Sequence, residues 1–332
     1  MQHKFGALDL IRAGLQDLDR ARTLFDELHN DGIDGDRMRL LLATLEKACD
    51  PDIALSNLVD IIKVMQSQGK DFTNIIADEN SFVRLITVLG VSDEMGKLMR
   101  FRPELVEAAA NDACESHLYN HEQRRAHVLK SVGADPNDHT MPTASLPLAE
   151  AATALRKTYR KQLAAIMAQD ATANDPIEIQ PRISTELSDL ADAALEGALA
   201  IARHEVDGSE HVRFAIIGMG KLGAQELNYV SDVDLIYVVE PADMDTNGMA
   251  LSRIGTKMAT TLQRVCQSVI MGVAEPTLWQ IDGGLRPEGK DGPLVRKLES
   301  HEAYYEQWAE NWEFQALLKA RPVAGDPDLG QA

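Results

Sequence analysis

The chain has 332 residues, which is enough for one large domain or two ordinary ones. Its formal net charge of −19 at pH 7 argues against nucleic acid as a partner, because a nucleic-acid-binding surface needs a basic stripe. No signal peptide opens the chain, and no apolar run approaches the roughly 20 residues that a membrane span needs. We therefore expect a cytoplasmic protein with no membrane contact.

The first two thirds of the chain carry a helical pattern without obvious chemistry. Apolar residues recur at helical spacing over 8–29, 36–48 and 55–65, and Asp50-Pro51 marks a helix stop and restart. We predict an all-α helical arm over 1–132. The segment 133–147, rich in Asp, Pro, Thr and Asn, is predicted to be a loop.

Two long helices are predicted next, over 148–169 and 183–205. The first helix has a basic face, which we interpret as a face exposed to solvent. Its cationic residues are Arg156, Lys157, Arg160 and Lys161. After residue 212 the pattern changes to alternating strands and helices. This arrangement indicates an α+β fold with a mixed sheet, and we assign 148–332 to a catalytic domain that includes the two leading helices.

The stretch 214–240 reads as strand, glycine-rich turn, short helix and strand. Phe214–Ile217 and Leu235–Val239 are the predicted strands. The turn between them holds three glycines and a lysine: Gly218, Gly220, Lys221 and Gly223. Backbone N–H groups of such a turn, at a helix start, could bind phosphate.

Two carboxylates open the second predicted strand. Asp232 and Asp234 are one residue apart, so on a strand they point to the same face. Like charges held side by side repel unless a cation lies between them. Mg²⁺ is the usual solution, because it binds one or two carboxylates together with substrate phosphates. The alternative is a pair of solvated turn residues.

A third carboxylate, Asp282, ends a short predicted strand over 277–281 and precedes a glycine-rich, cationic loop over 283–293. The pattern G-x-G-K…S-D-x-D…D is typical of a nucleotidyltransferase. G-x-G-x-x-G alone would favour a dinucleotide site, with Glu240 as the ribose-binding acid. Too few residues separate Gly223 from Ser231 for the helix that such a site requires, and the acids stand at the wrong end of the strand.

A helix is predicted over 300–320, with aromatic residues four apart. We expect Trp308 and Trp312 to pack in the core rather than to form a platform for adenine.

The stretch GMGKLGAQELNYVSDVDLIYV closely resembles the signature of the glutamine-synthetase adenylyltransferases, also called adenylyl-removing enzymes. IDGGLRPEGKDGPLV and YYEQWAENWEFQALLKARPVAGDP are similar to later family motifs, and the resemblance covers at least 210–328. The family protein joins two nucleotidyltransferase halves: the N-terminal half removes AMP from glutamine synthetase and the C-terminal half adds it. The helical arm and the E-L-N-x-x-S-D form resemble the N-terminal half. One departure is Gly284, where the family often has the first arginine of D-L-R-L-R-P, so no phosphate contact is assigned there.

The resemblance implies a polymerase-β-like nucleotidyltransferase fold and phosphorolysis of adenylyl-tyrosine on glutamine synthetase, giving ADP. It implies Mg²⁺ bound by three catalytic carboxylates, namely Asp232, Asp234 and Asp282. It also implies phosphate or nucleotide (ADP/ATP) binding by Gly218, Gly220, Lys221, Gly223, Ser231 and Arg286. A PII-type signalling protein and glutamine are expected effectors of the family. Two alternatives stay open: ATP-dependent adenylylation of glutamine synthetase, and a non-catalytic regulatory or docking module.

Overall fold

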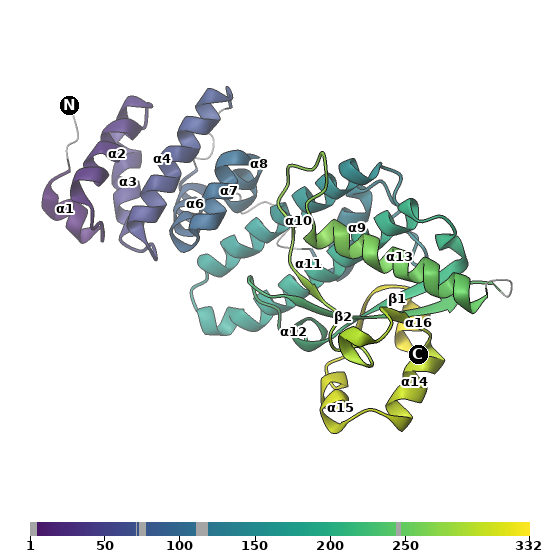
Figure 1. The fold of residues 1–332 in the computed structure, drawn as a ribbon. Coiled ribbons are helices and arrows are strands. Elements are labelled where there is room, and N and C mark those ends of the chain that lie inside the picture. Colours follow the sequence, from purple (N-terminus) through teal and green to yellow (C-terminus); the bar gives the residue numbers. More distant parts are fainter. Residues whose placement is uncertain (1–4, 71, 73–77, 111–118, 244–246) are drawn as a thin grey trace. The chain divides into compact units, whose positions relative to one another are not determined.

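A computed structural model describes residues 5–70, 72, 78–110, 119–243 and 247–332 (Figure 1). The chain forms two compact units, Met1–Leu118 with Lys161–Ile179 and Tyr119–Arg160 with Gln180–Ala332, called unit 1 and unit 2 below. Their bounds differ from the predicted 1–132 and 148–332. Residues 119–132 group with unit 2, and 161–179 group with unit 1.

Unit 1 is built from short helices around one apolar core. Five of these helices begin at an Asp or Ser whose side chain accepts a backbone N–H, which satisfies a donor that the helix end leaves free. The predicted helix over 8–29 is divided at Gly14, whose φ is 83°, and Asp17 caps the second piece. The helices are α1 (Ala7–Arg12), α2 (Leu18–Asn30), α3 (Gly35–Leu45), α4 (Pro51–Ser67), α6 (Glu79–Val91), α7 (Asp93–Phe101) and α8 (Glu104–Ala110).

Three further helices lead to the sheet: α9 (His121–Ser131), α10 (Leu148–Ala171) and α11 (Pro176–Glu205). Helix α11 begins seven residues earlier than the predicted 183, because Asp175 accepts the backbone N–H groups of Ile177 and Glu178. No helix among the described residues is both long and apolar enough to cross a bilayer.

The prediction that the basic face of α10 is exposed to solvent is wrong for Arg156 and Arg160, whose exposed fractions are 1% and 7%. Arg156 donates hydrogen bonds of 2.7–3.2 Å to the carbonyl oxygens of Val265, Ser268 and Glu275. A guanidinium has five N–H donors, so one side chain can satisfy several carbonyls at once. These bonds tie α10 to the end of α13 (Gly248–Gln267) and to the segment after it.

The sheet of unit 2 confirms the α+β fold. Its strands are β1 (Val212–Gly218), β2 (Val233–Pro241), β3 (Ile281–Asp282), β4 (Val295–Arg296) and β5 (Arg321–Gly325). The order is β3-β2-β1-β5, and β4 also pairs with β2. Strand β1 is antiparallel to β2 and β5, whereas β3 and β4 are parallel to β2. An antiparallel β1–β2 pair excludes the dinucleotide alternative, which needs two parallel strands joined by a helix.

Helices cover both faces of this sheet. On one face α13 packs closely enough that a Cβ on Gly255 would lie 3.0 Å from a Val239 methyl carbon. On the other face Ala215 and Val238 pack against Leu329 of α16 (Pro327–Gln331). Side chains alternate along a strand, so Asp234 belongs to the face of Val238, opposite α13.

The predicted helix over 300–320 is interrupted and forms α14 (Leu298–Gln307) and α15 (Asn311–Leu317). Glu310 and Glu313 make a capping box at the start of α15, which begins the new helix there. Trp308 and Trp312 are 73% and 52% exposed, so the prediction that they pack in the core is wrong.

Candidate active site

The structure brings the three predicted aspartates to one end of the sheet. Asp234 of β2 and Asp282 of β3 are partners in the parallel register, so their side chains leave the sheet on the same face. Asp232 is exposed and precedes β2 by one residue. Strand β2 places Asp234 beside the glycine loop, because Met219 donates its backbone N–H to the carbonyl oxygen of Asp234 at 2.9 Å.

Asp234 carries the electrostatic signature of a crowded anionic site. Burial raises the pKa of its carboxyl above the usual value, and the nearby charges of Asp232 and Asp282 raise it further. Lys221 acts in the opposite direction and lowers that pKa. The charges of Asp232 and Asp282 are therefore near enough to disfavour the ionised form of Asp234 in the absence of another cation.

Gly220 is the point at which the glycine loop meets this carboxylate. Its φ is 52°, a left-handed conformation that favours glycine, and a Cβ there would lie 2.5 Å from Oδ2 of Asp234. It begins α12 (Gly220–Gly223), a single short turn. The absence of a side chain at Gly220 lets the loop backbone approach the acid.

Gly218 and Gly223 hold the two ends of the same turn. Gly218 ends β1 and pairs with Leu235 on one side and with Arg321 on the other. At Gly223 a Cβ would lie 1.9 Å from the carbonyl oxygen of Lys319, so the segment before β5 lies directly against the loop. At Gly218 a Cβ would instead lie 2.7 Å from a methyl carbon of Val323, so that glycine makes room for a side chain of β5.

Lys221 and Ser231 lie together at the edge of the site. Lys221 Nζ donates to Ser231 Oγ at 3.4 Å, and that hydroxyl donates to Asn228 Oδ1 at 2.7 Å. The cation of Lys221 is therefore near the acids, since it lowers the pKa of Asp234, and Ser231 lies next to Asp232 in the chain.

The loop after Asp282 is shaped by its own hydrogen bonds. Asp282 Oδ1 accepts the backbone N–H of Gly284 at 2.7 Å, and a Cβ on Gly284 would lie 2.9 Å from that oxygen. Arg286, predicted to bind phosphate, donates to the carbonyl oxygens of Gly283, Lys290 and Gly292 through four bonds of 2.7–3.3 Å. Four of its five N–H groups are thus used within the loop.

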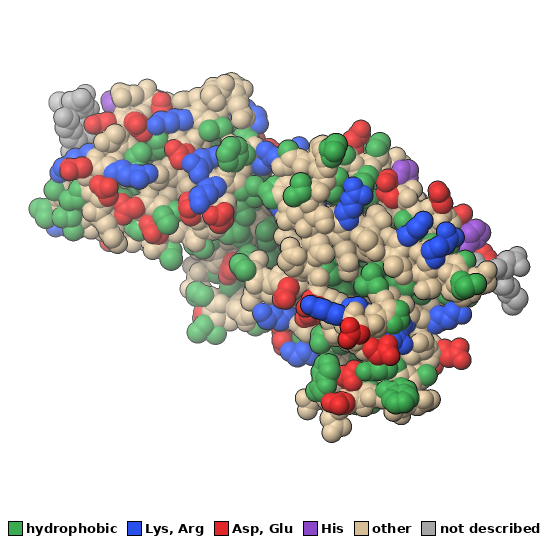
Figure 2. Space-filling view, viewed as in Figure 1, with side chains coloured by type: hydrophobic (Ala, Val, Ile, Leu, Met, Phe, Trp, Pro, Cys, Tyr) green, Lys and Arg blue, Asp and Glu red, His purple; other side chains and the backbone are tan. Residues whose placement is uncertain are grey.

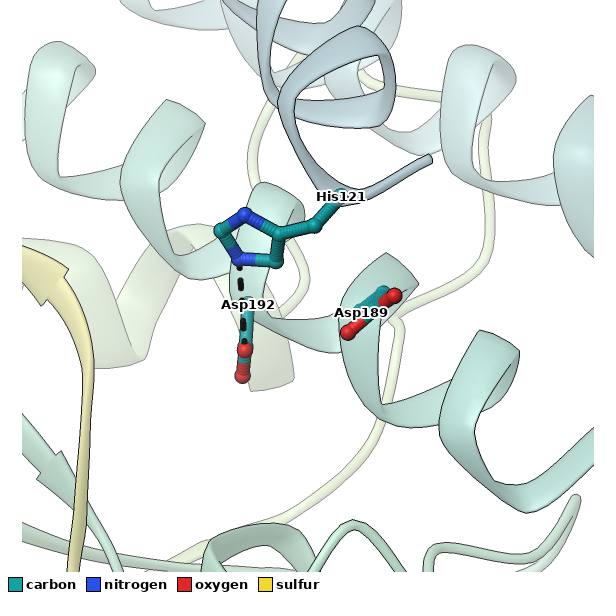
Figure 3. Close-up of side chains that lie close together, drawn as sticks. All are labelled: His121, Asp189 and Asp192. Carbon is teal, nitrogen blue, oxygen red and sulfur yellow. Dashed lines mark ion pairs between the residues drawn. The ribbon is translucent and has the colours of Figure 1, made fainter. Parts of the chain in front are cut away.

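Sequence reasoning missed a second polar cluster in unit 2. His121, Asp189 and Asp192 lie with their ligand atoms within 4.8 Å of one another, and His121 Nε2 is 3.5 Å from Asp192 Oδ2 (Figure 3). Asp189 and Asp192 are three apart on α11 and so share a face, but no spacing links them to His121. Arg321 already pairs with Asp192 at 2.5 Å, so a cation is built into this cluster.

The side chains around Asp234 offer the type of ligand atom that suits Mg²⁺. Three carboxylates supply the oxygen ligands that this ion prefers, and the raised pKa of Asp234 reports a charge that a divalent cation would offset. Their ligand atoms are more widely spread than those of the His121 cluster, which among the described residues is the group that falls within 4.8 Å. Mg²⁺ usually binds through one or two carboxylates and keeps several waters or phosphate oxygens, so it does not require all three carboxylates to be in mutual contact.

A family model described as glutamate-ammonia ligase adenylyltransferase matches residues 82–332. A relative from Bifidobacterium longum (strain DJO10A), named bifunctional glutamine synthetase adenylyltransferase/adenylyl-removing enzyme, is 73% identical over 329 residues, 99% of this chain and 31% of the relative. A protein of the same name from Cutibacterium acnes is 41% identical over 325 residues, 98% of this chain and 32% of the relative. The chain thus spans about a third of the length of these curated relatives. It belongs to the glutamate-ammonia ligase adenylyltransferase family.

Proposed function

We propose that this chain removes AMP from adenylyl-tyrosine of glutamine synthetase by phosphorolysis. The observation that carries the proposal is the meeting of Asp234, Asp282 and the glycine loop at one end of the sheet. The names of the relatives, which include an adenylyl-removing enzyme and glutamine synthetase, support the choice of substrate. The role in nitrogen regulation follows from that substrate.

The reaction is an in-line displacement at the α-phosphorus of the adenylyl group. A phosphate oxygen forms a bond to this phosphorus as the bond to the tyrosine oxygen breaks, and the departing phenolate takes up a proton. The products are ADP and free tyrosine on the protein. Phosphate is already an anion, so the step depends on positioning and charge neutralisation rather than on a general base.

The residues divide between metal binding and phosphate binding. Asp232, Asp234 and Asp282 would hold Mg²⁺, which when bound neutralises charge on the phosphate oxygens. Lys221 and Ser231 would contact phosphate directly, together with backbone N–H groups of the glycine loop. Arg286 has one N–H group left for phosphate, so its first role is to hold the shape of its own loop.

Incubation of adenylylated glutamine synthetase with the chain, Mg²⁺ and phosphate tests the proposal, with ADP as the readout. We expect ADP release that requires phosphate and is abolished in Asp232→Asn. The family description also names an adenylyltransferase, which favours ATP-dependent adenylylation as the second candidate. Pyrophosphate release from unmodified glutamine synthetase and ATP, without phosphate-dependent ADP release, would establish that direction instead.

If the chain has a regulatory or docking role and catalyses no reaction, a third result is expected. In that case neither incubation yields product, and Mg²⁺ has no effect on the chain. A PII-type signalling protein would then be a partner to test by direct binding.

A further inference from the structure

The short helix α12 ends in carbonyl groups that need donors. A helix of one turn leaves its last carbonyls without intrahelical partners. Arg321, the first residue of β5, donates through Nε to the carbonyl oxygen of Gly223 at 3.3 Å and through Nη2 to that of Leu222 at 3.1 Å, which also accepts the backbone N–H of Gln225 at 3.1 Å. One guanidinium therefore bonds to both of the last two carbonyl groups of α12.

That guanidinium is in turn fixed by a buried acid. Nη1 and Nη2 of Arg321 donate to the two oxygens of Asp192 at 2.5 and 3.2 Å, a bidentate geometry. The Asp192 side chain is 0% exposed. If the arginine moves away, this buried carboxylate keeps only the imidazole of His121 at 3.5 Å as a cationic partner, and only when that imidazole is protonated, so the pair favours one orientation.

The chain that leaves the loop is anchored to the same face of α11. Gln225, a residue with φ of 56°, donates through Nε2 to Asp189 Oδ1 at 3.1 Å. The backbone N–H of Leu227 donates to Ser188 Oγ at 3.3 Å. Ser188, Asp189 and Asp192 thus form a polar platform on α11 for residues 222–227.

On its opposite side the loop touches the candidate metal-binding acid, because Gly220 lies against Asp234. A shift of the Leu222 and Gly223 carbonyls would therefore move Gly220 and Lys221 relative to that carboxylate. We infer that Arg321 and Asp192 are a positioning pair, which sets the glycine loop against Asp234 so that it can receive phosphate. The catalytic part of this inference rests on the proposed function.

Strands β1 and β5 also provide a matched control pair. Arg213 at the start of β1 makes a bidentate pair with Asp326, just beyond the end of β5, at 2.6 and 2.8 Å. In the pairing of β1 with β5, Gly218 at the end of β1 lies opposite Arg321. Arg213, at the start of β1, is therefore at the end of these strands that is distant from the glycine loop. Arg213→Met removes a comparable ion pair from the same sheet without touching the loop.

Hydrogen exchange in the ligand-free chain tests the positioning role directly. The reporters are the amides of Gly223 and Ala224, which bond to the carbonyl oxygens of Met219 and Gly220 at 2.9 and 3.2 Å. In Arg321→Met we expect these amides to exchange at least about tenfold faster, and in Arg213→Met to stay at the wild-type rate. Unchanged exchange in Arg321→Met, or equal acceleration in both variants, would overturn the inference.

Kinetics provide the second readout. With adenylylated glutamine synthetase, Arg321→Met and Asp192→Asn should each lower kcat/KM for phosphate at least about tenfold, against less than about twofold for Arg213→Met. Arg321→Lys keeps the charge but not the fork, so it replaces Arg321→Met in both assays if that variant does not fold. If wild-type chain releases no ADP, the proposed function fails, and the exchange result alone decides the positioning role.

Discussion

Asp234 carries an electrostatic cost that a bound cation would remove. Its carboxyl is partly buried and lies near Asp232 and Asp282, and both effects raise its pKa above the ordinary value of 3.8. The folded chain therefore holds this proton more firmly than the unfolded chain does. The free energy of unfolding falls as pH rises above 3.8 through the folded-state pKa, so at pH 7 the ionised group destabilises the fold.

Asp234→Asn should therefore stabilise the metal-free chain while abolishing ADP release. We expect a higher Tm than wild type in EDTA at about pH 7, because asparagine cannot ionise. Addition of Mg²⁺ should raise the Tm of the wild type and not that of the variant. Asp207→Asn, an exposed change of the same charge, is the control. A Tm response to Mg²⁺ that survives in Asp234→Asn would contradict the metal assignment.

His121 makes the second prediction at this scale. Its hydrogen bond with Asp192 raises the pKa of the imidazole, and the charges of Asp189 and Glu122 add to the effect, although burial opposes it. A raised histidine pKa stabilises the fold fully below the unfolded value of 6.5, and this contribution is lost as pH rises through the folded pKa.

We expect His121→Gln to lower the free energy of unfolding more at about pH 6 than at about pH 9. Urea titrations at the two pH values measure the difference. His204→Gln, at the exposed C-terminal end of α11, serves as the comparison. An equal loss for His121→Gln at both pH values would show that the His121–Asp192 contact does not depend on the imidazolium.

At the scale of elements, buried arginine side chains stabilise connections by donating hydrogen bonds to carbonyl oxygens, which apolar side chains cannot do. Arg156 bonds to the carbonyl oxygen of Val265 near the end of α13 and to those of Ser268 and Glu275 in the segment that links α13 to β3, which has little regular structure of its own. Unpaired buried carbonyls cost about 1–3 kcal/mol each, so one guanidinium stabilises the whole connection.

Arg156→Met should lower the free energy of unfolding by at least about 3 kcal/mol, because it leaves these carbonyls without donors. Chemical denaturation at neutral pH measures the change. Lys157→Met, one residue further along α10 and exposed, should change it by less than about 0.5 kcal/mol. A loss for Arg156→Met no larger than the control would mean that water replaces the guanidinium there.

At the scale of the molecule, two long helices are shared between two compact units. Residues 161–179 of α10 and α11 belong to unit 1, whose core contains the fully buried Ala164 and Ala168. The sheet has its own core in unit 2. Lys and Arg side chains are interspersed with Asp and Glu on the face in Figure 2, without a continuous basic band.

Removal of residues 1–110 should therefore affect the units differently. We expect the amides of 161–171 to lose hydrogen-exchange protection, because their apolar contacts in unit 1 are gone. The amides of β1 and β2 should keep theirs, since Phe214 and Tyr237 are buried within unit 2. Full-length chain under the same conditions is the reference. Loss of protection in β1 and β2 would show that the two units fold as one.

Much of the fold and of the site follows from local patterns. Aspartates placed before apolar periodic runs determined several helix starts, because a cap bonds to an amide two or three residues away. The spacing of Asp232 and Asp234 predicted neighbouring carboxylates, and the charge of Asp232 raises the pKa of Asp234. Family membership was likewise readable from the motifs, and the comparisons confirm it.

Tertiary structure alone decided which polar residues are buried and paired. Arg321 meets Asp192 across 129 positions of sequence, and Arg156 meets Val265 across 109. Helical periodicity places a cation on a face of its helix but does not say what covers that face. The core prediction for Trp308 failed for the same reason, because an aromatic residue at helical spacing does not show whether other parts of the chain cover it. The antiparallel pairing of β1 with β2 came only from the backbone register.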